Sequence, residues 1–286
     1  MIKEKAWAKL NLNLHIIPKE SVNGYYPVRF INCQLTLHDD LFFISEKEKI
    51  TVVCDHPKLI DAQKNLVYKA ACLIKNMVKD KQLGVKIILK KNIPVRVGLG
   101  GGSSDAAATI RGLMKIWKVR LTTKQLFYLA ENLGRDVFYC LEGGLCEIRG
   151  DGAQVIPLIL KTPALRLVIV IPEEEKPSTS WMYKNLDFGK IGQNLNQLTR
   201  LKKGLRDNKK SEIFDSLHND FEYSVEKKNP FFSKIKVDFQ NFGAENSLLC
   251  GSGLAVAGFF ATQKKAKKAY DRLVFKYKNI ILTKTK

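Results

Sequence analysis

The sequence of 286 residues lacks any run of about 18 apolar residues, the length that a helix needs to cross a membrane. Its first 20 residues also lack the features of a secretory signal, because polar residues interrupt each apolar stretch and no small-residue cleavage site follows. These absences predict a soluble cytoplasmic protein. With 45% hydrophobic residues, the chain can build one large or two medium domains, at about 100–200 residues per domain.

Clustered metal ligands are also missing from the sequence. None of the six cysteines forms a C-x-x-C pair, and the four histidines are equally scattered. A structural zinc site needs ligands at short, regular spacings, so the sequence does not predict one. Reduced, buried thiols are the expected state. The residues are Cys33, Cys54, Cys72, Cys140, Cys146, Cys250, His15, His38, His56 and His218.

Acidic residues are few relative to basic ones, with 28 Asp and Glu against 48 Lys and Arg, a net charge of +20. Nucleic-acid binding would explain this excess. However, the lysines are spread along the whole chain, and neither an aromatic-rich single-strand platform nor helix-turn-helix spacing is evident. A generally lysine-rich composition is the simpler explanation. A basic surface would also concentrate phosphorylated substrates near the protein, which is compatible with both explanations. We expect no nucleic-acid partner, and a monomer or weak homodimer.

Period-two alternation predicts strands in the first part of the chain. In "KAWAKLNLNLHII" (residues 5–17) every second residue is apolar, and the opposite face carries Lys9, Asn11 and Asn13. A second strand is expected at 29–37, followed by a turn at 38–40 and a third strand. Further strands are expected at 49–54 and 85–94, and helical spacing predicts helices at 65–79, 105–117 and 123–133.

The second part of the chain mixes both patterns. Strands are expected within 141–152 and at 165–172, and the polar segment 190–229 is expected to be mostly helical. Residues 247–261 read as strand, glycine turn and strand, and 264–277 as a helix. A domain boundary near 157–164 gives an N-terminal domain of residues 1–160 and a C-terminal domain of residues 161–286.

A glycine-rich loop, "PVRVGLGGGSSDAAA" (94–108), lies between an expected strand and an expected helix. Glycine lets the backbone approach an anion closely, and the following helix adds its unpaired N–H groups and its dipole. Neither the Walker pattern G-x-x-x-x-G-K-[ST] nor the context of a Rossmann fingerprint is present. We therefore predict a nucleotide phosphate loop. Its residues are Pro94, Val95, Arg96, Val97, Gly98, Leu99, Gly100, Gly101, Gly102, Ser103 and Ser104.

The loop resembles the phosphate-binding motif of the GHMP kinases, which include galactokinase and the homoserine, mevalonate and phosphomevalonate kinases. Other segments resemble this family in the family's own order. They are "AKLNLNLHI" (8–16), "NGYYPV" (23–28), "LGRDVFYCLEGG" (133–144), "NDFE" (219–222) and "CGSG" (250–253). The S-S-D-A-A continuation is most similar to the branch whose acceptor is a cytidine diphosphate-linked methylerythritol.

The resemblance implies a two-domain α+β GHMP kinase fold. Its N-terminal domain would resemble the second domain of ribosomal protein S5, and its C-terminal domain would be ferredoxin-like. The implied activity is ATP-dependent phosphorylation of the 2-hydroxyl of that acceptor, in non-mevalonate isoprenoid biosynthesis. Mg²⁺ would accompany ATP to neutralise the β- and γ-phosphates, with ligands that the sequence leaves unknown.

The resemblance also implies roles for individual residues. Asp136 matches the catalytic aspartate and would act as the base, while Lys9 matches the active-site lysine and would stabilise developing charge. Tyr25 and Tyr183 would stack on the cytosine, since aromatic stacking is worth about 1–3 kcal/mol per base. The full set of expected substrate-binding residues is Asn11, Tyr25, Tyr26, Thr179 and Tyr183.

Several positions depart from the family pattern. Tyr26 stands where the family has a histidine that recognises the cytosine, and a tyrosine keeps an aromatic ring there but changes the hydrogen bonds it can form. Arg96 and Val97 replace small residues of the family. These larger side chains would narrow the part of the nucleotide pocket that holds the adenine, or Arg96 would contact a phosphate. Phe138 replaces a proline and Leu254 a serine.

Three alternatives to this function stay open from the sequence. The first is a GHMP kinase for homoserine, a mevalonate derivative or a sugar. The second is a basic nucleic-acid-binding protein on a kinase-like fold. The third is a catalytically silent homologue, against which the presence of both Lys9 and Asp136 argues.

Overall fold

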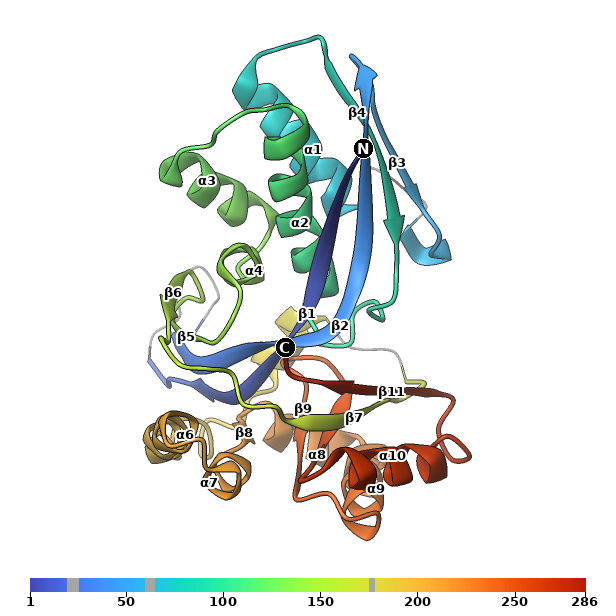
Figure 1. Cartoon of the computed structure of the whole chain (residues 1–286). Helices are drawn as coiled ribbons and strands as arrows, with labels where there is room; N and C mark the ends of the chain where they lie inside the picture. Colours follow the sequence, from blue (N-terminus) through green and yellow to red (C-terminus); the bar gives the residue numbers. More distant parts are fainter. Residues whose placement is uncertain (20–25, 60–64, 175–177) are drawn as a thin grey trace. The chain divides into compact units, whose positions relative to one another are not determined.

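A computed structural model describes residues 1–19, 26–59, 65–174 and 178–286 (Figure 1). The chain divides into two compact units that are each assembled from separate segments. Unit 1 consists of Met1–Ala8, Leu37–Val95 and Gly100–Glu142, and unit 2 of Lys9–Thr36, Arg96–Leu99 and Gly143–Lys286. The boundary expected near residue 160 lies inside unit 2, and the division into domains 1–160 and 161–286 stays a prediction.

Unit 1 is a sheet with helices on one face (Figure 1). The strand order is β3 (Ile50–Cys54), β4 (Leu83–Lys90), β2 (Val28–Lys47) and β1 (Ile2–Ile16). β4 pairs antiparallel with β2 and parallel with β3. The helices are α1 (Leu66–Val78), α2 (Gly101–Ile116), α3 (Thr123–Leu133) and α4 (Asp136–Glu142), and a short 3₁₀ helix spans Pro57–Leu59.

The core of unit 1 follows from the alternation in its strands. In β2 and β4, Leu41, Phe43, Val85 and Ile87 are fully buried, with polar or half-exposed residues between them. The alanines of α2 let that helix lie close to the strands, and Gly112 sits where a Cβ would lie 2.4 Å from the Phe43 ring. The apolar residues therefore form one layer between the sheet and the helices.

Unit 2 contains a four-stranded antiparallel sheet in the order β11 (Asn279–Lys284), β7 (Arg166–Ile171), β10 (Val256–Phe260) and β9 (Asn246–Leu249). α9 (Pro230–Asn241) and α10 (Gln263–Leu273) cover one face of it (Figure 1). The first half of β2 pairs with β5 (Cys146–Gly150), which pairs with β6 (Gln154–Pro157). The end of β1 pairs in parallel with β8 (His218–Asn219). The remaining helices are α5 (Thr179–Lys184), α6 (Asn196–Arg206), α7 (Lys210–Asp215) and α8 (Glu222–Lys228).

Most of the expected elements are confirmed, and the chain is mixed α and β as expected. The turn predicted at 38–40 is wrong, because β2 continues without a break through these residues. Asp39 is fully buried there, and its carboxylate accepts the backbone N–H groups of Asn92 at 2.5 Å and Ile93 at 2.8 Å. Those bonds hold the acidic side chain inside a strand, where the sequence indicates a turn.

Other boundaries also differ from the sequence prediction. α2 begins at Gly101 instead of 105, and β4 ends at Lys90 instead of 94. The sequence analysis did not identify α4 or β11 as separate elements. Across the described residues, no helix has both the length and the apolar character that a bilayer crossing requires.

Candidate active site

The glycine loop ends in unit 1 at the N-terminus of α2. Gly100 is the N-cap residue, with φ at 67°, and as a glycine it supplies no side-chain hydrogen bond to the first turn of the helix. The first N–H groups of an α-helix have no partner within the helix, and the helix dipole places partial positive charge there. Gly102 at this end is exposed, and the first turn contains no acidic residue. The geometry therefore suits a phosphate group.

A buried charge network lies behind this end of α2, with Lys91 between Asp39 and Asp105. The Lys91 Nζ lies 2.5 Å from an Asp39 oxygen and 2.7 Å from an Asp105 oxygen. Burial lowers the pKa of Lys91, but the two carboxylates outweigh it and hold that pKa above its ordinary value. Burial raises the pKa of Asp105 well above its usual range. The network anchors the end of β4 to α2, and it neutralises both carboxylates with the Lys91 ammonium.

Ser104 and Asp136 come from neighbouring helices of unit 1. The Ser104 hydroxyl donates to the Trp7 carbonyl and lies 3.6 Å from the Cys140 sulfur. Cys140 is one helical turn after Asp136, so both lie on the same side of α4. Asp136 is half-buried in the first turn of α4, and Ser103 is half-buried at the start of α2. Ser104 thus has a structural bond, whereas Ser103 is better placed for a ligand.

The middle of the glycine loop belongs to unit 2 and packs against the turn of residues 250–253. A Cβ on Gly98 would lie 1.7 Å from the Cys250 carbonyl oxygen, and one on Gly253 would lie 2.0 Å from the Val97 oxygen. Neither position has room for a side chain, so the two backbones are in direct contact. Arg96 is exposed with φ at 65°, in the left-handed region where small residues are favoured.

Lys9 begins a chain of buried polar side chains on β1 and β2 of unit 2. Its Nζ donates to Asn11 Oδ1 at 2.8 Å, and Asn11 Nδ2 donates to Asn32 Oδ1 at 2.7 Å. The Lys9 backbone N–H bonds the Leu99 carbonyl at 2.9 Å. A Cβ on Gly251 would lie 3.2 Å from the Lys9 Nζ. The lysine is therefore held beside the glycine loop and the turn of residues 250–253.

Four aromatic rings gather elsewhere in unit 2. Tyr26 and Tyr183 are nearly parallel, with centroids 6.3 Å apart and planes 22° apart. Phe188 lies edge-on to Tyr26 at 5.4 Å, and Phe221 lies edge-on to Tyr183 at 5.2 Å. Phe188 is about half exposed. We call Tyr26, Tyr183, Phe188 and Phe221 the aromatic cluster.

The other predicted site residues are spread among these features. Pro94 and Val95 are half-buried in unit 1, and Thr179 is exposed in the first turn of α5. Tyr25 lies outside the described residues. Unit 2 brings Lys9 and Asn11 together with the loop residues 97–99. Tyr26 and Tyr183 meet in another part of unit 2, and Asp136 and Ser103 belong to unit 1.

Three residues of these clusters were missed by the sequence analysis, namely Asn32, Phe188 and Phe221. The Asn32 Nδ2 is buried without a hydrogen-bond partner among the described residues. Asn32 lies between apolar residues in an expected strand, and this polar interruption was the available signal. Phe188 lies in a segment without a clear period, and Phe221 lies in the "NDFE" segment, whose resemblance indicates no contact with Tyr26.

Comparison with known proteins agrees with these features. The family "GHMP kinases N terminal domain" matches residues 65–144. The chain is 35% identical to 4-diphosphocytidyl-2-C-methyl-D-erythritol kinase of Caldicellulosiruptor bescii, covering 99% of this chain and 98% of the relative. A crystal structure of 4-(cytidine 5'-diphospho)-2C-methyl-D-erythritol kinase superposes with a TM-score of 0.84 at 27% identity, covering 99% of both chains. A crystal structure of L. major mevalonate kinase shares the fold, with a TM-score of 0.76 at 16% identity over 100% of this chain and 96% of that one.

Proposed function

The chain belongs to the GHMP kinases, in the branch of the 4-diphosphocytidyl-2-C-methyl-D-erythritol kinases, and we propose that it phosphorylates the 2-hydroxyl of 4-diphosphocytidyl-2-C-methyl-D-erythritol. ATP is the phosphoryl donor in this family. The observation that carries the proposal is the uncapped N-terminus of α2, which follows a glycine loop and carries no acidic side chain in its first turn. Such an end binds phosphate through backbone N–H groups and the helix dipole.

The phosphoryl transfer itself depends mainly on positioning and charge stabilisation. We propose that the N–H groups of the loop and of α2 hold the phosphates of ATP. Lys9, a cation fixed by Asn11, stabilises the charge that develops as the phosphoryl group moves. Asp136 takes the proton of the acceptor hydroxyl.

The donor is proposed to bind as Mg·ATP. A divalent ion neutralises the β- and γ-phosphates, and Mg²⁺ prefers oxygen ligands. The hydroxyl of Ser103 supports this assignment, because it offers an oxygen in the first turn of α2 and is only half-buried.

The cytosine base is proposed to bind at the aromatic cluster. Carbon layers in contact lie about 3.5 Å apart, so a base between two rings needs about 7 Å between them. The centroids of Tyr26 and Tyr183 lie 6.3 Å apart with planes 22° apart, so the rings are roughly aligned for stacking and would have to separate by about 1 Å to admit a base. Tyr26 would thus contribute a stacking face where the family has a histidine, without the hydrogen bond of an imidazole.

An ADP-release assay with Mg·ATP and 4-diphosphocytidyl-2-C-methyl-D-erythritol tests the function. The wild type is expected to turn over this acceptor, and Asp136→Asn to lower kcat by about 10²–10⁴-fold, the usual contribution of a general base. Asp80→Asn, at an exposed carboxylate of the same unit, is the control and keeps full activity. Folded wild type without turnover would contradict the proposal.

The same assay separates this function from its alternatives. Cytidine diphosphate is expected to compete with the acceptor, because only a pocket that binds cytidine responds to it. Turnover of homoserine, mevalonate or a sugar without inhibition by cytidine diphosphate would assign the chain to another acceptor. Tight oligonucleotide binding that Asp136→Asn leaves unchanged would favour the nucleic-acid alternative.

A further inference from the structure

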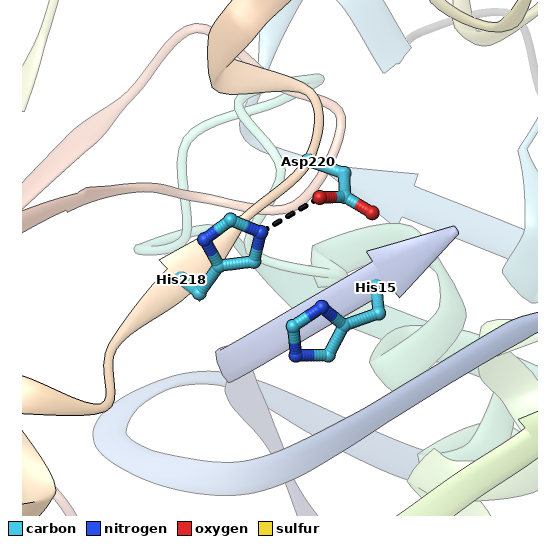
Figure 2. Close-up of side chains that lie close together, drawn as sticks. All are labelled: His15, His218 and Asp220. Carbon is cyan, nitrogen blue, oxygen red and sulfur yellow. Dashed lines mark hydrogen bonds and ion pairs between the residues drawn. The ribbon is translucent and has the colours of Figure 1, made fainter. Parts of the chain in front are cut away.

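Two histidines that are far apart in the sequence meet at the end of β1 in unit 2. β1 and β8 pair in parallel, with Asn13 opposite His218 and Leu14 opposite Asn219. This register brings His15 beside His218, with ring centroids 4.7 Å apart and planes 20° apart. Figure 2 shows Asp220 next to both rings.

We propose that His15, His218 and Asp220 bind a divalent transition-metal ion of the zinc type. Each residue offers one ligand atom, and the three atoms lie within 4.8 Å of one another. Imidazole nitrogen and carboxylate oxygen are ligands that zinc accepts, at about 2.0–2.2 Å. Ligand atoms of a tetrahedral zinc ion lie about 3.4 Å apart at these bond lengths, so the ion would draw the most distant pair together by more than about 1 Å.

The state of His15 is the main argument for this site. Its side chain is fully buried, and neither ring nitrogen has a hydrogen-bond partner among the described residues. A neutral imidazole carries one donor and one acceptor, and burying both unpaired is unfavourable.

Asp220 is held in place as a ligand would be. Its Oδ2 accepts the backbone N–H groups of Ile16 at 2.7 Å and Gly192 at 3.0 Å, which leaves Oδ1 facing His218 Nε2 at 2.7 Å. Backbone bonds to a carboxylate fix the orientation of a metal ligand. The simpler assignment, an ion pair between His218 and Asp220 alone, accounts for Oδ1 but leaves both nitrogens of His15 unexplained.

The wide separation of the three residues in the sequence explains why no metal site was predicted. Sequence motifs for metal sites consist of ligands that are close in the chain, whereas here the parallel pairing of β1 with β8 brings distant residues together. A bound ion would join the end of β1, the segment after β8 and the Gly192 loop, and so would act as a structural crosslink in unit 2.

Cobalt titration of the full-length, tag-free protein after chelator treatment tests the proposal. Wild type is expected to bind equimolar Co²⁺ with visible d–d absorption, to lose that absorption when Zn²⁺ is added, and to show a raised Tm with either ion. His218→Gln and Asp220→Asn, which keep similar shapes, are expected to lose both the absorption and the Tm rise. His56→Gln, in unit 1, is the control and behaves as wild type.

Nitrogen NMR of the histidine rings in the wild type needs no variant and covers the case in which a variant fails to fold. Addition of Zn²⁺ is expected to shift one ring nitrogen each of His15 and His218 and to leave His38 and His56 unchanged. Folded wild type that binds no metal, or binding that His218→Gln and Asp220→Asn leave intact, would overturn the proposal.

Discussion

Glu147 is a buried carboxylate of unit 2 that three cations surround. Its oxygens lie 2.8 Å from the Arg29 Nε, 2.8 Å from the Arg149 Nε, and in contact with Lys202. Burial alone raises the pKa of Glu147, but the hydrogen bonds from Arg149, Lys202 and Arg29 outweigh it and lower the pKa from 4.5 to about 2. The carboxylate therefore ties α6 to β2 and β5.

This shift predicts a pH-dependent contribution to stability. Between pH 2 and 4.5 the unfolded state binds more protons at Glu147 than the folded state, so its contribution is complete above 4.5 and is lost towards 2. Glu147→Gln is expected to lower the free energy of unfolding by about 1.5–3 kcal/mol at pH 7, the value of hydrogen bonds to a charged group. Urea titrations of variant and wild type should show this difference shrinking from pH 5 to pH 3.

The exposed Glu131 provides the matched control for that series. Glu131 is 47% exposed and lies 3.9 Å from Arg135. Exposed pairs contribute little, so Glu131→Gln should stay within about 1 kcal/mol of wild type at every pH. A Glu147→Gln difference that is the same at pH 3 and pH 7 would show that lost packing, and not the charge, sets its stability.

At the scale of single residues, sequence motifs identified some residues of the candidate site. Residues that join the site only through contacts in the folded chain were not identified. Lys9 and Asn11 alternate with apolar residues in β1, and their bond to each other is confirmed at 2.8 Å. Asn32, which completes this chain of polar side chains, meets Asn11 through the pairing of β1 with β2. The segment 38–40 predicts a turn from sequence, whereas in β2 the Asp39 carboxylate is held by its bonds to Lys91, Asn92 and Ile93.

At the scale of elements, periodicity identified the strands and helices with one clear face. β1, α1 and α3 were predicted within a few residues because their apolar residues recur at a regular spacing, and β7 because residues 167–170 form a continuous apolar run that is buried on both faces. α4 has only seven residues, too few to show a clear helical period. The sequence of this segment therefore indicated a family-like motif around Asp136 but no helix. The start of α2 was placed late because glycine is a poor helix former, whereas Gly101 and Gly102 are in the helix.

The contact between the glycine loop and the turn of residues 250–253 gives a prediction at this scale. Gly253→Ala would place a methyl group 2.0 Å from the Val97 oxygen and 2.5 Å from the Gly98 nitrogen, so one backbone must move. We expect a loss of about 1–3 kcal/mol in stability, the usual cost of overpacking, and a raised KM for ATP because the loop shifts. Urea unfolding and initial rates measure the two effects.

Gly189→Ala is the control for this substitution. Its added methyl group would lie 3.5 Å from the nearest atom, an Asp187 carboxylate oxygen, which is ordinary contact. This variant should keep the stability and the KM of the wild type. If Gly253→Ala behaves like Gly189→Ala, the close backbone approach between the loop and the turn has no energetic role.

At the scale of the whole molecule, the net charge of +20 acts on every anion that approaches. The proposed substrates are polyanions, so long-range attraction should raise their association rate. Raising the ionic strength from about 10 to 100 mM shortens the Debye length from about 30 to 10 Å. We therefore expect kcat/KM for ATP to fall several-fold over this range, while kcat stays constant because the bound state is unaffected.

The same salt series decides between the explanations of the basic composition. If the charge concentrates phosphorylated substrates, an oligonucleotide competes weakly and its inhibition fades as salt rises. A nucleic-acid-binding protein would instead bind it tightly at low salt, with a logarithmic slope proportional to the number of phosphates contacted. Electrostatic attraction of substrates must weaken when salt screens the charge. An enzyme that turns over normally with a kcat/KM independent of salt would therefore show that the excess of lysines has no role in substrate binding.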